Sequence, residues 1–205
     1  MGWVRRGWLW IRLLCFAEFL QGADLITVYL YDYSGLSRET LARAERETSR
    51  IYRHSNLEVS WTQCPTPDGK ATGLNPCRPA SEAPVLALSI LPRDMEGRMR
   101  ESAGLAGRGL VSGIAVGGHA YVFQQRVVEA CGNGKYPQDV VLGHLMAHEL
   151  GHVLLGENSH SPLGLMSAKL SPRDLRLALD GMLFFDSNQA ARMKDRLSRQ
   201  RVAER

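Results

Sequence analysis

The chain has 205 residues, of which 44% are hydrophobic and 22% charged, so it is long enough for one packed domain and short for two. Its formal net charge is +4, but the first 23 residues hold three arginines and one glutamate, which leaves +2 for the remainder. The basic stretch at the end, "RMKDRLSRQRVAER", has no aromatic residues between its charges that could stack on bases. We therefore expect a solvated helix face there and no nucleic-acid partner.

The first 23 residues are typical of a secretory signal. "MGWVRR" is a basic start, "GWLWIRLLCFAEFL" an apolar run, and "QGA" a small-residue end before Asp24. Arg12 and Glu18 interrupt the apolar run, so it is too broken to form a stable membrane span. We expect a signal peptide over residues 1–23 and a secreted or periplasmic protein. The alternative is an amphipathic extension that stays attached.

The residues that follow predict an α/β fold. "LITVYLYDY", residues 25–33, is rich in β-branched and aromatic residues and predicts a strand. "SRETLARAERETSRIYRHS" predicts an amphipathic helix with Ser37 as its N-cap. "LEVSWTQC" alternates as a second strand, and "PVLALSILP" is too apolar to be exposed on either face, which is typical of a central strand. This order predicts a small mixed sheet backed by helices.

Two cysteines bracket a loop that has little to bury. The loop "CPTPDGKATGLNPC" runs from Cys64 to Cys77 and is rich in proline and glycine. A disulfide between these two cysteines would tie down a segment that packing cannot hold, and it would fit an oxidising compartment. Cys131 is then left over, and we expect it to be a buried or idle thiol.

A glycine-rich stretch, "AGLAGRGLVSGIAVGG", occupies residues 103–118. It lacks the lysine followed by serine or threonine that a phosphate-binding loop needs, so nucleotide binding is not expected. We expect a flexible rim loop leading to an edge strand at residues 113–123, where unpaired backbone groups could accept an extended peptide. The alternative is that the glycines only permit tight turns.

The stretch "PQDVVLGHLMAHELGHVLLG" predicts a buried helix that carries a metal-binding pattern. His148 and His152 are four residues apart, so both imidazoles lie on one helix face and can reach one ion. Glu149 points around the helix, where it can sit beside the ion without binding it and take a proton from a metal-bound water. The HExxH pattern therefore predicts a zinc site with hydrolytic chemistry.

A third ligand is expected just beyond this helix. Gly156 can take the left-handed conformation that ends a helix, and the chain must then reverse to carry His160 back to the metal. Three histidines would leave the fourth zinc position to water, which is the arrangement of a catalytic site and not of a structural one.

Other ligand sets remain open at this point. Glu157 or Asn158 could replace the loop histidine if the loop is tighter, and a carboxylate on the next helix, Asp174 or Asp180, is a more distant choice. His144 falls on the same helix face as the first ligand, and we expect it to support a ligand or to pack in the core.

The run "HELGHVLLGENSHSPLGLM" resembles the signature of the metzincin metalloproteases, HExxHxxGxxH followed by a methionine turn. In this resemblance Met166 is the methionine beneath the metal site. The spacing departs from the family, because one extra residue precedes Gly156 and another precedes His160. The chain more closely resembles a set of uncharacterised bacterial proteins that share the form "HE.GH.LLG..SHS..G.M", over most of the sequence after residue 23.

The resemblance implies a metzincin-like zincin fold: a small twisted mixed sheet of four or five strands with a backing helix, an active-site helix, the methionine turn and C-terminal helices. Some metzincins place a tyrosine just after the methionine turn, whereas "SAKLSPRD" follows Met166 here. His119 and Tyr121, on the expected edge strand, are the only candidates we name for contact with a developing oxyanion or the substrate.

Together these patterns predict that residues 24–205 form a zinc metalloendopeptidase. One zinc ion would be held by the three histidines and would lower the pKa of a bound water, with Glu149 as general base. We expect a peptide or protein substrate and a monomer. The alternative function is a zinc-containing module that binds a peptide or a partner without hydrolysing it; Glu149, which binding alone would not require, favours the enzyme.

Overall fold

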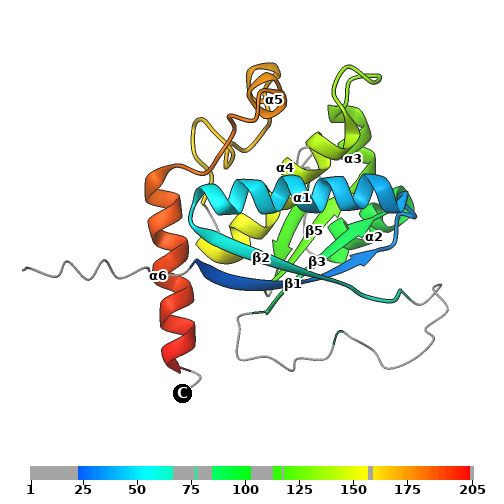
Figure 1. Ribbon diagram of the computed structural model, residues 1–205. Helices are drawn as coiled ribbons and strands as arrows, with labels where there is room; N and C mark the ends of the chain where they lie inside the picture. The colour runs from blue at the N-terminus through cyan, green and yellow to red at the C-terminus, as the bar shows by residue number, and fades with distance from the viewer. Residues whose placement is uncertain are drawn as a thin grey trace, which may run out of the picture.

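The computed structural model describes most of the chain after the expected signal (Figure 1). The described residues are 23–66, 77, 85–102, 113–116, 118–156 and 159–203. The expected signal peptide, residues 1–23, therefore lies almost entirely outside the described residues. Figure 1 shows α1 running across the sheet and α6 standing at one end of it.

The described strands form one five-stranded sheet in the order β2-β1-β3-β5-β4. Neighbouring strands are parallel except for β4, which is antiparallel to β5. The predicted mixed sheet is confirmed, and β3 lies at its centre, as its apolar sequence predicts. The strands are β1 (Asp24–Asp32), β2 (Leu57–Gln63), β3 (Val85–Leu91), β4 (Gly113–Val116) and β5 (His119–Phe123).

The prediction of a single edge strand over residues 113–123 is wrong. These residues form a hairpin in which β5 pairs with β3 on one side and with β4 on the other, so β4 alone is the edge. Gly118 lies just before β5 and has φ of +84°, a backbone conformation that lets the chain reverse. Gly118 therefore serves a tight turn beside the edge strand, and the predicted rim loop, residues 103–112, lies outside the described residues.

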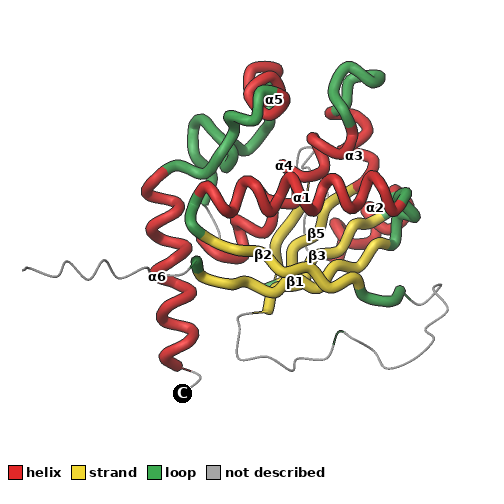
Figure 2. Tube along the Cα trace, viewed as in Figure 1, coloured by secondary structure: helices red, strands yellow, loops and turns green. Residues whose placement is uncertain are grey.

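Two helices, α1 (Arg38–His54) and α4 (Gln138–Leu155), cover one face of the sheet (Figure 2). The hydroxyl of Ser37 accepts a hydrogen bond from the Thr40 backbone N–H at 3.1 Å, which confirms the predicted N-cap. Every second residue of the inner strands points toward these helices and is buried. The strand residues of this core are Ile26, Val28, Leu30, Leu86, Leu88, Ile90, Ala120 and Val122.

Helices α1 and α4 approach each other at Gly143. The Thr48 hydroxyl donates a 2.9 Å hydrogen bond to the Gly143 carbonyl oxygen. A Cβ atom at Gly143 would lie 2.7 Å from the Cβ of Glu47 and 3.0 Å from the Ala44 carbonyl oxygen. This glycine therefore permits the close contact that seats the ligand-bearing helix against α1.

Replacing Gly143 with alanine is expected to lower the free energy of unfolding by about 1–3 kcal/mol, because the new methyl group forces the two helices apart. Gly97→Ala is the matched control: Gly97 is also helical and has no atom within 4 Å of an added Cβ, so its helix propensity should rise without a clash. Denaturant unfolding of both variants measures the difference. Equal effects of the two substitutions would contradict close packing at Gly143.

The remaining described helices are α2 (Arg93–Ser102), α3 (Gln124–Ala130), α5 (Pro172–Leu179) and α6 (Ser187–Ala203). The basic helix α6 buries Met193 and Leu197 completely. Its Arg192 donates a 3.1 Å hydrogen bond to the Leu155 carbonyl oxygen at the end of α4. Among the described helices, none combines the length and the apolar character that a membrane span requires.

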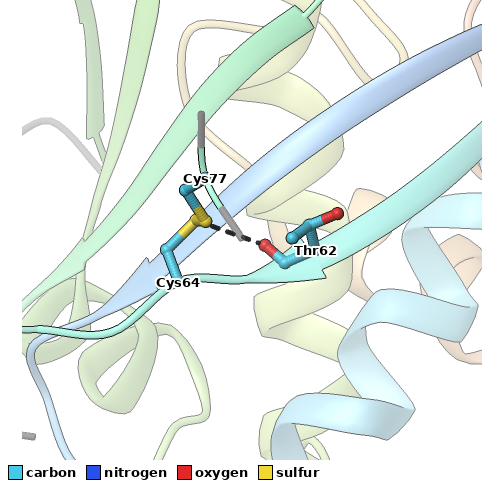
Figure 3. The surroundings of a disulfide bond; sticks show 3 residues. All are labelled: Thr62, Cys64 and Cys77. Atoms are coloured by element: carbon cyan, nitrogen blue, oxygen red, sulfur yellow. Dashed lines mark hydrogen bonds between the residues drawn. A yellow bond between two sulfur atoms is a disulfide. The ribbon is translucent and has the colours of Figure 1, made fainter. Parts of the chain in front are cut away.

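The structure pairs Cys64 with Cys77, as the sequence predicts (Figure 3). The Cα atoms of the two cysteines are 5.8 Å apart, a usual separation for a disulfide. The bond lies beside Thr62, at the end of β2. Cys131 is buried and free, which confirms that part of the prediction.

Candidate metal centre

The three predicted ligands meet at one point. His148 and His152 lie one turn apart on α4, and His160 lies in the segment that follows the helix. The Nε2 atom of His152 is 3.0 Å from that of His148 and 3.1 Å from that of His160. Within the described residues, these are the metal-ligating side chains whose ligand atoms gather within 4.8 Å of one another. The two extra residues in the motif therefore do not prevent convergence.

The hydrogen bonds of the rings prepare them to bind a cation. The Nδ1 atom of His148 lies 2.8 Å from the Leu165 carbonyl oxygen, which can only accept. Nδ1 therefore carries the proton, and the Nε2 of the neutral ring presents its lone pair to the other histidines. Nitrogen ligands at 2.0–2.1 Å from a tetrahedral zinc are about 3.3–3.4 Å apart, close to the observed spacings. The donor set and its spacing fit a zinc ion.

Both helix histidines are held in the neutral form. Burial lowers the pKa of His148 to about 4, against the opposing effect of its hydrogen bond to Leu165. Burial also lowers the pKa of His152 to about 3, and the neighbouring His148 and His160 lower it further. Neutral imidazole is the form that binds metal, so no proton has to be displaced from these two rings at neutral pH.

Ser159, which was not among the predicted site residues, supports the second ligand. Its side-chain oxygen lies 2.8 Å from the Nδ1 atom of His152, and the residue is buried. A group that holds the far nitrogen of a ligand histidine fixes the direction of the nitrogen that binds metal. A serine next to a candidate ligand histidine, as in "NSHS", is the signal that could have found it.

Replacing Ser159 with alanine is expected to lower zinc affinity by about 10–100-fold, because the His152 ring loses the contact that orients it. Competition with a chelator of known affinity measures the change. Ser167→Ala is the matched control, since that exposed hydroxyl bonds only the Lys169 carbonyl oxygen among the described residues. An affinity equal to wild type in Ser159→Ala would show that the contact does not orient the ligand.

Gly156 ends the helix and starts the reversal toward His160. Its φ is +90°, so the predicted positive φ is confirmed, but its ψ of 173° differs from the left-handed helical value that was expected. This region of backbone space is essentially restricted to glycine. Farther on, the Ser161 N–H donates a 2.9 Å hydrogen bond to the Met166 carbonyl oxygen, which closes the turn that carries the methionine.

Met166 packs directly under the ligand helix. It is fully buried, and a Cβ atom at Gly151 would lie 2.8 Å from its sulfur and 2.9 Å from Cε1 of Phe185. Gly151 lies next to the ligand His152 on α4, so the methionine fits only because that position has no side chain. The same turn supplies the Leu165 carbonyl that holds His148.

Glu149 is buried between α4 and the edge of the sheet. Only 2% of the residue is exposed, and this burial raises the pKa of its carboxyl to about 8. A Cβ atom at Gly113 on β4 would lie 2.6 Å from both Cγ and Cδ of Glu149 and would also collide with the Tyr121 carbonyl oxygen. The edge strand therefore passes against Glu149, and only glycine fits at this contact. The sequence did not single out Gly113 for this role.

The predicted contacts of His119 and Tyr121 with the reacting group are not supported. These residues alternate along β5 with Ala120 and Val122, whose side chains belong to the core beneath α4. Tyr121 instead packs with the separate cluster of Leu91 and Phe123. Both side chains therefore lie on the opposite face of the sheet from the three histidines.

The other candidate ligands lie elsewhere. Asp174 forms the capping box of α5, where its carboxylate accepts hydrogen bonds from the backbone and the hydroxyl of Ser171 at 2.9 and 2.6 Å. Asp180 follows α5 and is exposed. His144 is fully buried in the core, with its Nδ1 2.9 Å from the Val140 carbonyl oxygen, and does not join the histidine group.

The two remaining alternatives for the third ligand, residues 157 and 158, lie outside the described residues.

Comparison with known proteins finds similarity among solved structures alone. No protein-family model matches the sequence, and no curated protein matches it significantly. The crystal structure of archaemetzincin from Methanopyrus kandleri is similar with a TM-score of 0.49 and 18% identity, over 87% of this chain and 98% of that one. A zinc-dependent peptidase from Methanocorpusculum labreanum is similar with a TM-score of 0.48 and 17% identity, over 81% of this chain and 99% of that one.

Proposed function

We propose that this chain is a zinc metalloendopeptidase in which His148, His152 and His160 hold one zinc ion and Glu149 is the general base. The observation that carries the proposal is the convergence of three imidazole nitrogens within 4.8 Å beside a buried glutamate. Three protein ligands leave a tetrahedral zinc one further position, which is typical of catalytic sites and not of structural ones.

The chemistry divides between the ion and the protein. Zinc, when bound, supplies a Lewis acid that makes water nucleophilic near neutral pH. The Glu149 carboxylate accepts a proton from the attacking water and returns it to the nitrogen of the leaving amine. Burial alone raises the pKa of Glu149 to about 8. The positive charge of a bound zinc ion would lower that pKa and favour the carboxylate form that accepts the proton. Ser159 holds the His152 ring in place, and Met166 packs under the helix that carries it.

The edge strand β4 is the proposed platform for the substrate. One side of β4 pairs with β5, and its other side has no strand partner among the described residues. An extended peptide that adds to this edge would satisfy the free backbone groups. Because Gly113 touches Glu149, a peptide held along β4 lies next to the general base. This placement supports a peptide substrate.

Metal dependence tests the proposal. We expect the protein to cleave a mixture of diverse peptides, to lose this activity with a zinc chelator, and to regain it with zinc but not with magnesium, as read by mass spectrometry of new termini. Cleavage that survives the chelator would exclude the zinc mechanism. A protein that binds zinc but cleaves nothing would be the non-hydrolytic binding module.

An exported location is also part of the proposal. The Cys64–Cys77 disulfide supports it, because such bonds persist in oxidising compartments and are rare in the cytosol. Thiol labelling of the protein from its native host tests this point. After unfolding, labelling of Cys131 without labelling of Cys64 or Cys77 is expected, whereas labelling of Cys64 and Cys77 as free thiols would place the chain in a reducing compartment.

A further inference from the structure

A hollow lies on the face of the sheet that α4 does not cover. Its volume is about 460 Å³, within the range of small-molecule sites. Ser89, Leu91 and Tyr121 line it from the two strands β3 and β5, and Met95 and Arg98 line it from α2. Since alternate residues of a strand point to opposite faces, the sheet separates this hollow from the three metal-binding histidines.

Flat aromatic rings form the walls of the hollow. The rings of His119 and Tyr121 stack with centroids 4.4 Å apart and an angle of 8° between their planes. Tyr33 also lines the hollow, and its ring lies nearly parallel to that of Tyr31 behind it, with centroids 6.5 Å apart and planes at 15°. Together with the apolar Leu91, these surfaces fit a planar ring better than a branched aliphatic group.

Several hydrogen-bonding groups around these rings have no partner within the described part of the chain. The buried Ser89 hydroxyl lies 2.9 Å from Nε2 of His119 and fixes that ring. The Nδ1 atom of His119 and the hydroxyls of Tyr33 and Tyr121 have no hydrogen-bond partner among the described residues. Burial lowers the pKa of His119 and raises that of Tyr121, so both rings are uncharged near neutral pH.

Arg98 is the one charged residue among the described lining residues. Its nearest described acid is Asp94, at 3.7 Å, and both side chains are about three-quarters exposed, at 74% and 76%. Such an exposed pair is weak, so the guanidinium can turn to another anion. The helix that carries Arg98 is fixed, because Glu96 on α2 is buried and forms a 2.6 Å ion pair with Arg126 of α3.

We propose that this hollow is a binding site for a small aromatic carboxylate. The ring lies against the stacked His119 and Tyr121 and beside Met95. The hydroxyls of Tyr33 and Tyr121 and the Nδ1 atom of His119 bond its polar substituents, and Arg98 pairs with its carboxylate. The chemistry is that of a small-molecule pocket with apolar walls and few polar anchors. The site is distinct from the metal centre and does not depend on the proposed peptidase activity.

Calorimetric titration of the full chain with 4-hydroxyphenylacetate tests the site, and tyramine, which has the same ring but a positive charge, is the matched ligand. We expect one molecule of 4-hydroxyphenylacetate to bind per chain, saturably, with a Kd of about 1 mM or tighter. Tyramine should bind about tenfold more weakly. Arg98→Gln is expected to weaken binding of the acid by about tenfold. Arg176→Gln, an exposed arginine on α5, is the control and should leave the Kd unchanged.

The same titration after removal of metal separates this site from the zinc centre, since a carboxylate could also bind zinc. The Kd should not change on metal removal. The absence of binding up to about 10 mM, a range that covers weak small-molecule affinities, would overturn the proposal. So would equal binding of tyramine, or an Arg98→Gln variant that binds the acid as wild type does. Binding that disappears when the metal is removed would also overturn it.

Discussion

The Glu149→Ala variant is expected to keep its zinc and to lose peptide hydrolysis. A positioned general base contributes about 10²–10⁴-fold to the rate, so kcat should fall by at least this range. Zinc affinity should stay close to wild type, because Glu149 is not one of the three side chains whose nitrogens converge. Peptide cleavage followed by mass spectrometry, in samples with measured zinc content, gives both quantities.

A glutamine at the same position is the control for packing. Glu149 is buried against Gly113, so alanine leaves an empty space there, whereas Glu149→Gln keeps nearly the same shape. Both variants should be inactive if the carboxylate accepts the proton. Activity near wild type in either variant, in protein that holds zinc, would show that Glu149 is not the base.

Replacing His160 with alanine is expected to weaken zinc binding by more than about 100-fold, because losing a ligand costs more than losing a group that only orients one. His160 is exposed and lies outside the helices, so the fold should survive the change. Activity should fall together with zinc content. Competition with a chelator of known affinity provides the measurement.

His54→Ala is the matched control for this experiment. His54 is also exposed, at the end of α1, where its ring stacks on Phe184, and it is not in the histidine group. The zinc affinity of the His54→Ala variant should equal that of the wild-type protein. Wild-type affinity in His160→Ala would remove this residue from the ligand set and return attention to residues 157 and 158.

Much of the fold follows from local sequence patterns. Each of three elements has a sequence pattern that is typical of one kind of secondary structure. They are the strand near residue 25, the capped helix after Ser37 and the central apolar strand. Helices α2 and α3 were not predicted. The seven-residue α3 begins without a side-chain cap and follows β5 directly, so the sequence lacks the signals that separate a helix from the end of a strand.

The metal centre could be predicted because its ligands depend on helix geometry. Two histidines four residues apart share a face in any helix. To place His160 at the same ion, the chain only has to reverse direction after the helix, and Gly156 indicates such a reversal. His119 and Tyr121 were predicted to contact the reacting group, but they lie on the face of the sheet away from α4. A one-residue shift along a strand moves a side chain to the other face, and the sequence alone does not determine which face α4 covers.

The contacts that support the centre were harder to predict, because they join segments far apart in the chain. Gly113 against Glu149 depends on the position of β4 relative to α4. Gly151 against Met166 depends on how the methionine turn packs under the helix. In both cases another element comes so close that only glycine fits. A local sequence pattern cannot predict such a contact.

X-ray absorption at the zinc edge of the zinc-loaded protein tests the central claim most directly, because it reads the number and kind of ligands. We expect one zinc ion per chain with three imidazole nitrogens and one oxygen ligand, the arrangement of a catalytic site. A zinc with four protein ligands, with a sulfur ligand or with fewer than three imidazoles would contradict a catalytic centre built on His148, His152 and His160.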